Sequence, residues 1–166
     1  MTETPSSREA DRDAALAALT EAVPYNRFLG VRFDRLGDEL TARLPFAETL
    51  VGNPFLPALH GGVTGALLEI TALVQLAWDG VLVEMETGGA AAERIEAGEF
   101  PPMPKTIDVT VDYLRSGRPR ETFARAEVQK VGRRVAHIHV HAWQAERARP
   151  IAMLRGNFLM PEKARG

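Results

Sequence analysis

The amino-acid sequence predicts an α+β fold in which an antiparallel sheet wraps around one long central helix. The helix is predicted at residues 63–78, a stretch without proline and, after Gly65, without glycine. It is apolar on nearly every side, and a helix with that pattern is a buried one. Segments of alternating polar and apolar residues stand before and after it, and short turns join the later ones. Such segments are typical of antiparallel strands, which would cover the helix.

The N-terminal segment, residues 1–24, is expected to carry a disordered tail that ends at Ser7, followed by a short helix. Ser7 would cap this helix over residues 8–23, and Pro24 would end it. The segment is too short for a helix-turn-helix domain, which argues against a transcription factor. Residues 25–166 are expected to form a single domain, because the chain length and the 45% share of hydrophobic residues suit one core.

The strands of the sheet are expected on both sides of the helix, separated by turns rich in glycine and proline. Two precede the helix and four follow it, at residues 31–35, 39–44, 105–114, 122–131, 134–145 and 150–160. Residues 25–30 are expected as a turn into the sheet, and 45–59 as an irregular approach to the helix. The strand at 105–114 places one set of side chains on a single face, namely Ile107, Val109, Val111 and Tyr113.

A long connection, residues 84–104, lies between the helix and the strand that follows it. Residues 81–85 either prolong the helix or begin a strand, and 90–97 predict a second, short helix. A surface excursion is the simpler interpretation of this connection. The functional interpretation is a flap over a ligand pocket, with Phe100 and Met103 as its apolar wall.

The composition limits the classes of partner. The net charge is −2, without a long run of one sign, which argues against nucleic acid as the main partner. The sequence has no cysteine, so it has no disulfide, no thiol nucleophile and no cysteine-bound metal. No uncharged apolar run reaches the roughly 18 residues of a membrane span, and the N-terminus lacks an apolar secretion core. We therefore expect a cytoplasmic protein without a membrane partner.

The start of the central helix holds the residues that indicate chemistry. His60 is followed by Gly61 and Gly62, whose missing side chains let another molecule approach the backbone. The first N–H groups of a helix lack internal partners and lie at the positive end of its dipole, so they suit an anion or a developing oxyanion. Glu69 is the one ionised side chain between His60 and Asp79, and an acid in so apolar a helix needs a reason.

The spacing of Gly61 and Glu69 adds a constraint. They are eight residues apart, which is roughly 12 Å along a helix axis. The Gly61 N–H and the Glu69 carboxylate of one chain can therefore hardly act on the same atom. If both are catalytic, they come from two copies whose helices lie antiparallel and side by side. The spacing thus favours a dimer with two shared sites.

The pattern of Asn53, His60-Gly61-Gly62 and Glu69 resembles the signature of hotdog-fold acyl-CoA thioesterases of the PaaI (phenylacetate degradation) type. The resemblance covers roughly residues 25–161. It implies a hotdog fold that dimerises through its sheet, assembled as a homotetramer. It also implies hydrolysis of an acyl-CoA to a free acid and CoA, without a metal or a bound cofactor. Aryl, short-chain and medium-chain acyl groups all remain open.

The resemblance assigns a role to five residues. Glu69 is the general base that activates a water, or the nucleophile that attacks the thioester carbonyl directly. The Gly61 N–H polarises that carbonyl, with the helix dipole behind it. His60 lies beside the carbonyl, Asn53 holds the carbonyl or the water, and Thr106 helps to position the acid or the water.

Contacts to the rest of the substrate are expected from Gly62, from Phe100 and from arginines. Arginine suits the phosphates of CoA because its planar fork of donors matches phosphate oxygens. Several arginines stand in turns beside strands, namely Arg115, Arg118, Arg120, Arg133 and Arg134. We expect Arg115 and Arg118 to contact CoA.

Each of these residues also has a purely structural interpretation. Glu69 could pair with an arginine or a loop, and the two glycines could form a plain tight turn. His60 could orient that turn by a hydrogen bond to the backbone. Asn53 could form its own loop turn, and Thr106 could be an ordinary strand residue.

Three histidines alternate along the strand at 134–145. His137, His139 and His141 share one face, which invites a metal hypothesis. An exposed or subunit-contacting face is the better interpretation, because the opposite face is the apolar one that suits the core.

Two other functions compete with thioester hydrolysis. A hotdog dehydratase or enoyl-CoA hydratase needs a histidine paired with the acid, and none lies between Met1 and Leu59. A non-catalytic acyl-CoA-binding module is the second, and the intact set of Asn53, His60, Gly61 and Glu69 argues against it.

Overall fold

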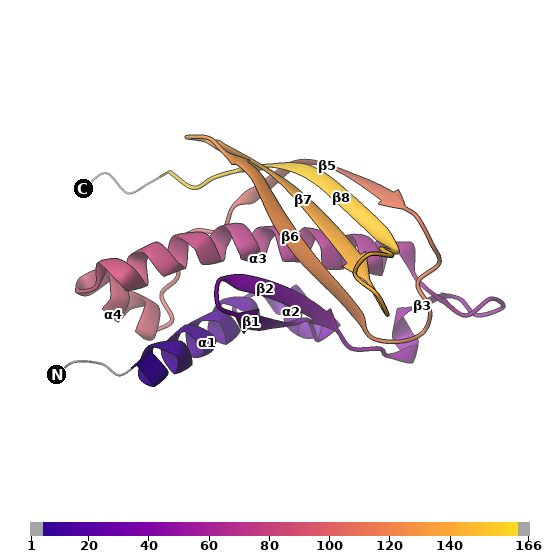
Figure 1. The fold of residues 1–166 in the computed structure, drawn as a ribbon, viewed down its shortest axis with the longest axis horizontal. Helices are drawn as coiled ribbons and strands as arrows, with labels where there is room; N and C mark the ends of the chain where they lie inside the picture. The colour runs from indigo at the N-terminus through magenta and orange to yellow at the C-terminus, as the bar shows by residue number, and fades with distance from the viewer. Residues whose placement is uncertain (1–4, 163–166) are drawn as a thin grey trace.

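The structure, a computed structural model, describes residues 5–162 and has the predicted arrangement of a sheet around a central helix (Figure 1). A six-stranded antiparallel sheet, in the order β1-β2-β6-β7-β8-β5, curves around helix α3 (Gly61–Thr87). Its strands are β1 (Arg32–Leu36), β2 (Glu39–Leu44), β5 (Lys105–Tyr113), β6 (Thr122–Val131), β7 (Val135–Trp143) and β8 (Ala152–Leu159). The predicted strands are thus confirmed, with ends that differ by a few residues.

Helix α3 is the centre of the core. Leu67, Leu68 and Trp78 on the helix are fully buried, and the inner face of β7 that covers it has Ala136, Ile138, Val140 and Ala142 at 0% exposure. The helix is longer than predicted, because residues 81–85 prolong it to Thr87. Its length and composition would also suit a membrane span, but more than half of its most apolar window is buried inside the protein.

The N-terminal region differs from the sequence prediction. Helix α1 (Pro5–Glu21) begins before Ser7, which therefore lies inside the helix instead of capping it, and residues 1–4 lie outside the described part. Residues predicted as a turn form a short helix, α2 (Pro24–Leu29). Pro24 begins this helix, because a proline at the first helical position lacks only an N–H that has no partner there.

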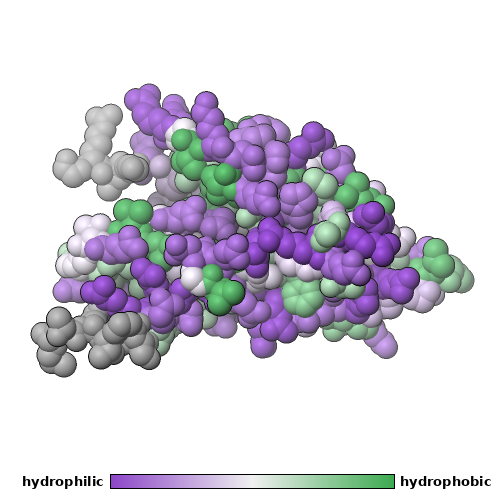
Figure 2. Space-filling model, viewed as in Figure 1, coloured by the Kyte–Doolittle hydropathy of each residue, from purple (hydrophilic) through white to green (hydrophobic). Residues whose placement is uncertain are grey.

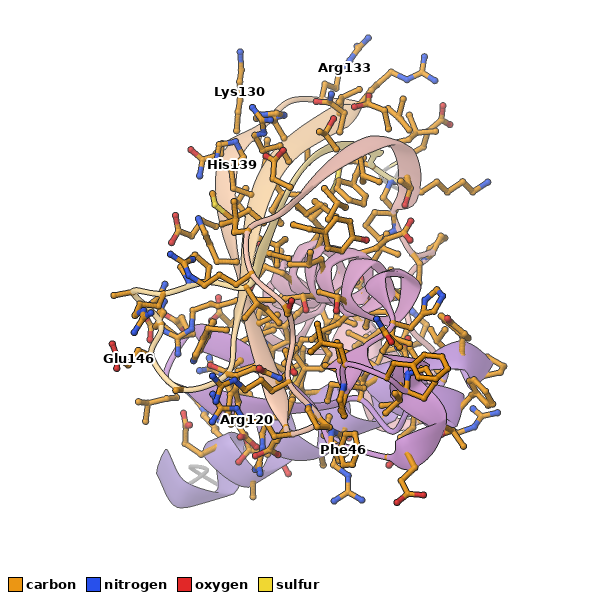
Figure 3. The ribbon with its side chains drawn as sticks, turned by 90° about the vertical axis from the view of Figure 1, so that its right-hand side faces the viewer. Phe46, Arg120, Lys130, Arg133, His139 and Glu146 are labelled. Carbon is orange, nitrogen blue, oxygen red and sulfur yellow. The ribbon has the colours of Figure 1, made fainter. Side chains whose placement is uncertain are left out.

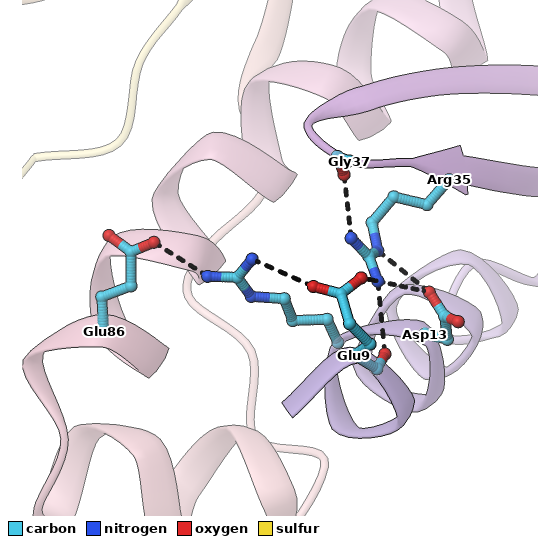
Figure 4. Close-up of polar contacts among 6 residues, drawn as sticks. Glu9, Asp13, Arg35, Gly37 and Glu86 are labelled. Carbon is cyan, nitrogen blue, oxygen red and sulfur yellow. Dashed lines mark hydrogen bonds and ion pairs between the residues drawn. The ribbon is translucent and has the colours of Figure 1, made fainter. Parts of the chain in front are cut away.

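Helix α1 is fixed to the domain by packing and by charge. Leu16 and Leu19 belong to the same buried cluster as the central helix. Arg35 on β1, with a side chain 3% exposed, binds Glu9 at 2.6 Å and Asp13 at 2.9 Å, and it donates to the Gly37 carbonyl (Figure 4). These contacts tie α1 to the first hairpin of the sheet.

The connection after α3 contains the predicted short helix, α4 (Ala90–Glu96), with Ile95 buried. Phe100 and Met103 pack against the hydrophobic core. The approach to α3 is more regular than predicted. It holds a 3₁₀ turn (Glu48–Leu50) and a small hairpin of β3 (Val51–Asn53) and β4 (Ala58–Leu59), which projects beyond the start of α3 (Figure 1).

Candidate active site

The first turn of α3 leaves one backbone donor unused. His60 is the N-cap residue, and its Nδ1 accepts a hydrogen bond from the Gly62 N–H at 2.9 Å. Its carbonyl accepts from the N–H groups of Val63 and Thr64 at 3.0 and 3.2 Å. Within residues 5–162, the Gly61 N–H has no hydrogen-bond acceptor. The positive end of the helix therefore presents a single free donor at Gly61.

A groove of about 420 Å³ lies directly beside this donor. The residues around it come from the start of α3, the end of β5 and the loops next to them, namely Ala58, Leu59, Gly61, Thr64, Tyr113, Leu114, Arg115, Ser116, Gly117 and Ile151. The lining combines apolar side chains with backbone groups and with the polar side chains of Thr64, Tyr113, Arg115 and Ser116. The groove can therefore accept an apolar chain or a thin polar arm that ends at the Gly61 N–H.

Glu69 and Thr106 are brought together, as predicted, although 37 residues separate them. The Thr106 hydroxyl, at the start of β5, donates to Glu69 Oε1 at 2.6 Å. A short hydrogen bond from a hydroxyl to a carboxylate holds one oxygen in place and leaves the other available. Helix α3 is continuous from Gly61 past Glu69, so the donor and the carboxylate of one chain remain roughly 12 Å apart along the axis.

Glu69 lies on a face of α3 that the chain covers only in part. This open face consists of residues at helical spacing, none of which is fully buried: Gly62, Ala66, Glu69 and Leu73. Ala66 and Leu73 pack partly against the core. Strand β5, next to it, is an edge strand that pairs only with β8 among the described strands. Ile107 on β5 is 53% exposed. On the face of β5 predicted from alternation, Val111 packs against the core, whereas Ile107, Val109 and Tyr113 are left exposed.

Asn53 lies in the β3–β4 hairpin and serves its own turn. Its Oδ1 accepts from the backbone N–H groups of Phe55 at 3.0 Å and Leu56 at 3.1 Å, which leaves only Nδ2 for another partner. The turn holds Phe55 97% exposed and Leu56 69% exposed. Figure 2 shows the resulting hydrophobic cluster at the tip of the projecting hairpin, on a face that is otherwise mostly hydrophilic. The hairpin is thus a fixed apolar finger beside the start of α3.

The arginines predicted as a cluster are divided between two ends of the sheet. Arg120 and Arg133 lie at opposite ends of β6 (Figure 3). Arg115 lines the groove, and its Nη1 donates to the Pro150 carbonyl at 2.7 Å. The recorded hydrogen bonds of Arg118 come from its backbone, which pairs with Gln144, so its exposed side chain is held by no partner among the described residues.

The three histidines lie on the outer face of β7 (Val135–Trp143), opposite the face that covers α3. Figure 3 shows His139 on the outer side of the sheet. His137 Nδ1 lies 3.0 Å from Asn157 Oδ1, and Asn157 Nδ2 donates to Asp108. Within residues 5–162 no three acidic or histidine side chains are arranged to share a metal ion. The three histidines therefore belong to a polar outer surface.

Tyr113 is a site residue that the sequence did not reveal. Its hydroxyl donates to the Gly61 carbonyl at 2.8 Å, its ring lies beside Gly61, and its hydroxyl also lies close to Gly65. The sequence pattern places it only among the alternating residues of β5. A polar tip on an otherwise apolar strand face was the one available signal, because the partner glycines are about fifty residues away in the chain.

Comparison with known proteins identifies the family. The family model described as the thioesterase superfamily matches residues 56–151 of the chain. The chain belongs to the thioesterase superfamily. A relative of this thioesterase, the medium/long-chain acyl-CoA thioesterase YigI of Escherichia coli strain K12, is 32% identical over 126 residues, covering 75% of this chain and 77% of YigI.

Solved structures share the fold of this thioesterase. A protein from Chromobacterium violaceum is 34% identical and superposes with a TM-score of 0.63. The match covers 93% of this chain and 97% of the chain of that protein. The PaaI protein of the Escherichia coli phenylacetic acid degradation operon is 14% identical, with a TM-score of 0.66 over 90% of this chain and 93% of its own. The PaaI likeness concerns the fold alone.

These matches confirm several predictions made from the sequence. The hotdog fold, which PaaI shares, and an enzyme that hydrolyses thioesters are confirmed. The roles of individual residues in this thioesterase remain predictions, and the structure adds the geometry by which they can be tested.

Proposed function

We propose that this thioesterase hydrolyses medium- or long-chain acyl-CoA thioesters in a site shared by two copies of the chain. The observation that carries the proposal is that helix α3 presents both a free donor at Gly61 and a carboxylate, Glu69, that Thr106 holds in place. An oxyanion donor and a general base are the two groups that thioester hydrolysis needs. The relationship to YigI, a medium/long-chain acyl-CoA thioesterase, supports this substrate class, and the groove beside Gly61 offers space for the substrate.

The reaction follows from the two groups. The thioester carbonyl oxygen accepts a hydrogen bond from the Gly61 N–H, which polarises the carbonyl carbon. Glu69 of the second copy removes a proton from a water as its oxygen bonds to that carbon. The tetrahedral intermediate then expels the CoA sulfur, which takes up the proton, and the free acid is left. Direct attack by Glu69 to give a mixed anhydride remains open. The proposed chemistry uses no metal or bound cofactor.

A dimer explains the open face of α3. If Gly61 of one helix lies opposite Glu69 of an antiparallel partner, the midpoint of the pair falls at residue 65. Residues 65 and 66 are glycine and alanine, so the two backbones can approach closely there. The apolar finger would then lie beside the C-terminal half of the partner's helix, where its exposed Phe55 and Leu56 would be covered.

The exposed edge of the sheet fits the same dimer. A long unpaired strand edge readily pairs with another strand, and β5 carries both Thr106 and the uncovered Ile107. We propose that two β5 strands pair across the dimer axis and that two dimers form a homotetramer. Arg115 and Arg118 are the proposed contacts for the CoA phosphates.

The hydratase alternative finds less support at this site. Its chemistry requires a histidine paired with the acid, whereas the recorded partner of Glu69 is Thr106. His60 is occupied at Nδ1 by the Gly62 N–H.

The proposed function is tested by release of free CoA thiol from a panel of straight-chain and aryl acyl-CoAs. The chain has no cysteine, so a thiol reagent meets no protein background. We expect kcat/KM to rise by up to about fourfold for each added methylene until the groove is filled, because burial of a methylene contributes about 0.8 kcal/mol. Phenylacetyl-CoA should be a poorer substrate than a medium-chain acyl-CoA. Absence of turnover on every thioester would refute the proposal.

A further inference from the structure

The His60 imidazole is held on two edges by glycines. A Cβ atom placed on Gly52 would lie 2.9 Å from His60 Cδ2, and one placed on Gly62 would lie 3.0 Å from Nδ1. A side chain at Gly52 would force the surrounding atoms to shift, and one at Gly62 would make a tight contact with the ring. The ring is thus confined between the β3–β4 hairpin and the start of α3. Nε2 is the one ring nitrogen left at the exposed end.

The hydrogen bond at Nδ1 fixes the proton on this ring. A backbone N–H can only donate, so Nδ1, which lies 2.9 Å from the Gly62 nitrogen, must act as acceptor. The neutral imidazole then carries its hydrogen on Nε2, where it is a donor. In this tautomer the exposed edge of His60 gives a hydrogen bond and cannot take a proton.

Tyr113 supports the same hydrogen bond from the other side of a peptide group. The Gly61 carbonyl and the Gly62 N–H belong to one peptide group. The carbonyl accepts from the Tyr113 hydroxyl at 2.8 Å, and the N–H donates to His60 Nδ1. Hydrogen bonds in a chain polarise one another, so the hydrogen bond from Tyr113 strengthens the one from the Gly62 N–H to His60. A Cβ atom placed on Gly65 would lie 3.3 Å from the Tyr113 hydroxyl, a tight contact, so the missing side chain of Gly65 leaves room for this hydroxyl.

We propose that Tyr113 is a positioning residue that acts through the Gly61–Gly62 peptide to keep His60 in its Nε2–H form. His60 then donates a hydrogen bond to the substrate next to the Gly61 N–H, and it is not the base of the reaction. This inference rests on the proposed function, because it assigns His60 and Gly61 to one substrate carbonyl.

The test compares three variants of the full-length protein with a medium-chain acyl-CoA. Tyr113→Phe removes one hydrogen bond and keeps the ring, and we expect kcat to fall about 3- to 10-fold with KM unchanged. His60→Asn keeps an acceptor for the Gly62 N–H, because asparagine is a good N-cap residue, but it lacks the outer donor. We expect it to lower kcat about 10- to 100-fold. Tyr25→Phe, at the other tyrosine of the chain, should change neither constant.

The combination of variants and a spectroscopic readout make the test specific. In the His60→Asn background, Tyr113→Phe should lower kcat almost no further. The chain of hydrogen bonds from Tyr113 through the Gly61–Gly62 peptide then no longer ends at an imidazole donor. Nitrogen NMR of the imidazole should show unprotonated Nδ1 and protonated Nε2 in the wild type, with the His60 signals identified by their loss in His60→Asn. In Tyr113→Phe we expect those signals to move toward a mixture of tautomers.

Two results would overturn the proposal while thioesterase activity itself stays intact. One is an unchanged kcat and an unchanged His60 spectrum in Tyr113→Phe. The other is a rise in KM with constant kcat, which would make Tyr113 a wall of the groove alone. An inactive wild type would instead refute the proposed function. The NMR spectra would still decide whether Tyr113 acts on the His60 tautomer.

Discussion

Replacing Glu69 by glutamine should lower kcat for acyl-CoA hydrolysis by a factor of about 100 to 10,000, the contribution that a positioned general base usually makes. Glutamine has nearly the same size, and its carbonyl oxygen can still accept from Thr106, whose hydroxyl lies 2.6 Å from Glu69 Oε1. The helix should therefore remain folded while the base or nucleophile is lost. Steady-state kinetics with a thiol reagent measures the effect, and circular dichroism checks the fold.

Asp79→Asn is the matched control for this variant. Asp79 lies on the same helix and accepts from Gln75 at 2.9 Å, one helical turn away, so its role is local. We expect its substitution to leave kcat within about twofold, as is usual for a surface residue outside the site. A Glu69→Gln protein with nearly wild-type kcat would show that Glu69 is a structural acid and would leave the reaction without a base.

Substitution of Gly61 by proline should abolish the oxyanion donor without unfolding the helix. Gly61 is the first helical residue, where proline is favoured, and its N–H has no acceptor within the described chain. His60 before it has φ −62° and ψ 132°, the extended conformation that a residue before proline requires. We expect kcat to fall about 100- to 1,000-fold, the usual cost of one oxyanion donor, with an unchanged melting temperature.

The control for this variant is Gly61→Ala, which keeps the N–H. A Cβ at this position would lie 3.5 Å from the Tyr113 ring, an ordinary contact, so we expect a much smaller loss of kcat than with proline. Equal losses in the two variants would mean that space beside Tyr113 matters and the Gly61 N–H does not. Full activity in Gly61→Pro would show that the Gly61 N–H is not the oxyanion donor.

The sequence predicted the parts of this molecule that depend on local pattern. The central helix, its cap region and Glu69 lie within thirty residues of one another, and the apolar run and the His60-Gly61-Gly62 turn indicate them directly. The inner face of β7 was predicted for the same reason, because alternation along a single strand decides which residues face the core.

Features that depend on contacts between distant residues were missed. Tyr113 was assigned only to a strand face, because its partner carbonyl at Gly61 is reached through the fold. The exposed apolar residues of β5 were unexpected, since alternation cannot tell an edge strand from a central one. Pro24 ended one helix in the prediction and begins another in the structure, because proline is compatible with both roles.

The central claim is that each site combines Gly61 of one copy with Glu69 of another, and mixed dimers test it most directly. Glu69→Gln and Gly61→Pro chains are each expected to be nearly inactive alone. Equal amounts unfolded and refolded together should form mixed dimers, each with one intact and one doubly defective site. Because half of the dimers would be mixed, we expect recovery of about a quarter of wild-type activity. Recovery no greater than the sum of the two separate variants would place both groups in one chain and contradict the shared site.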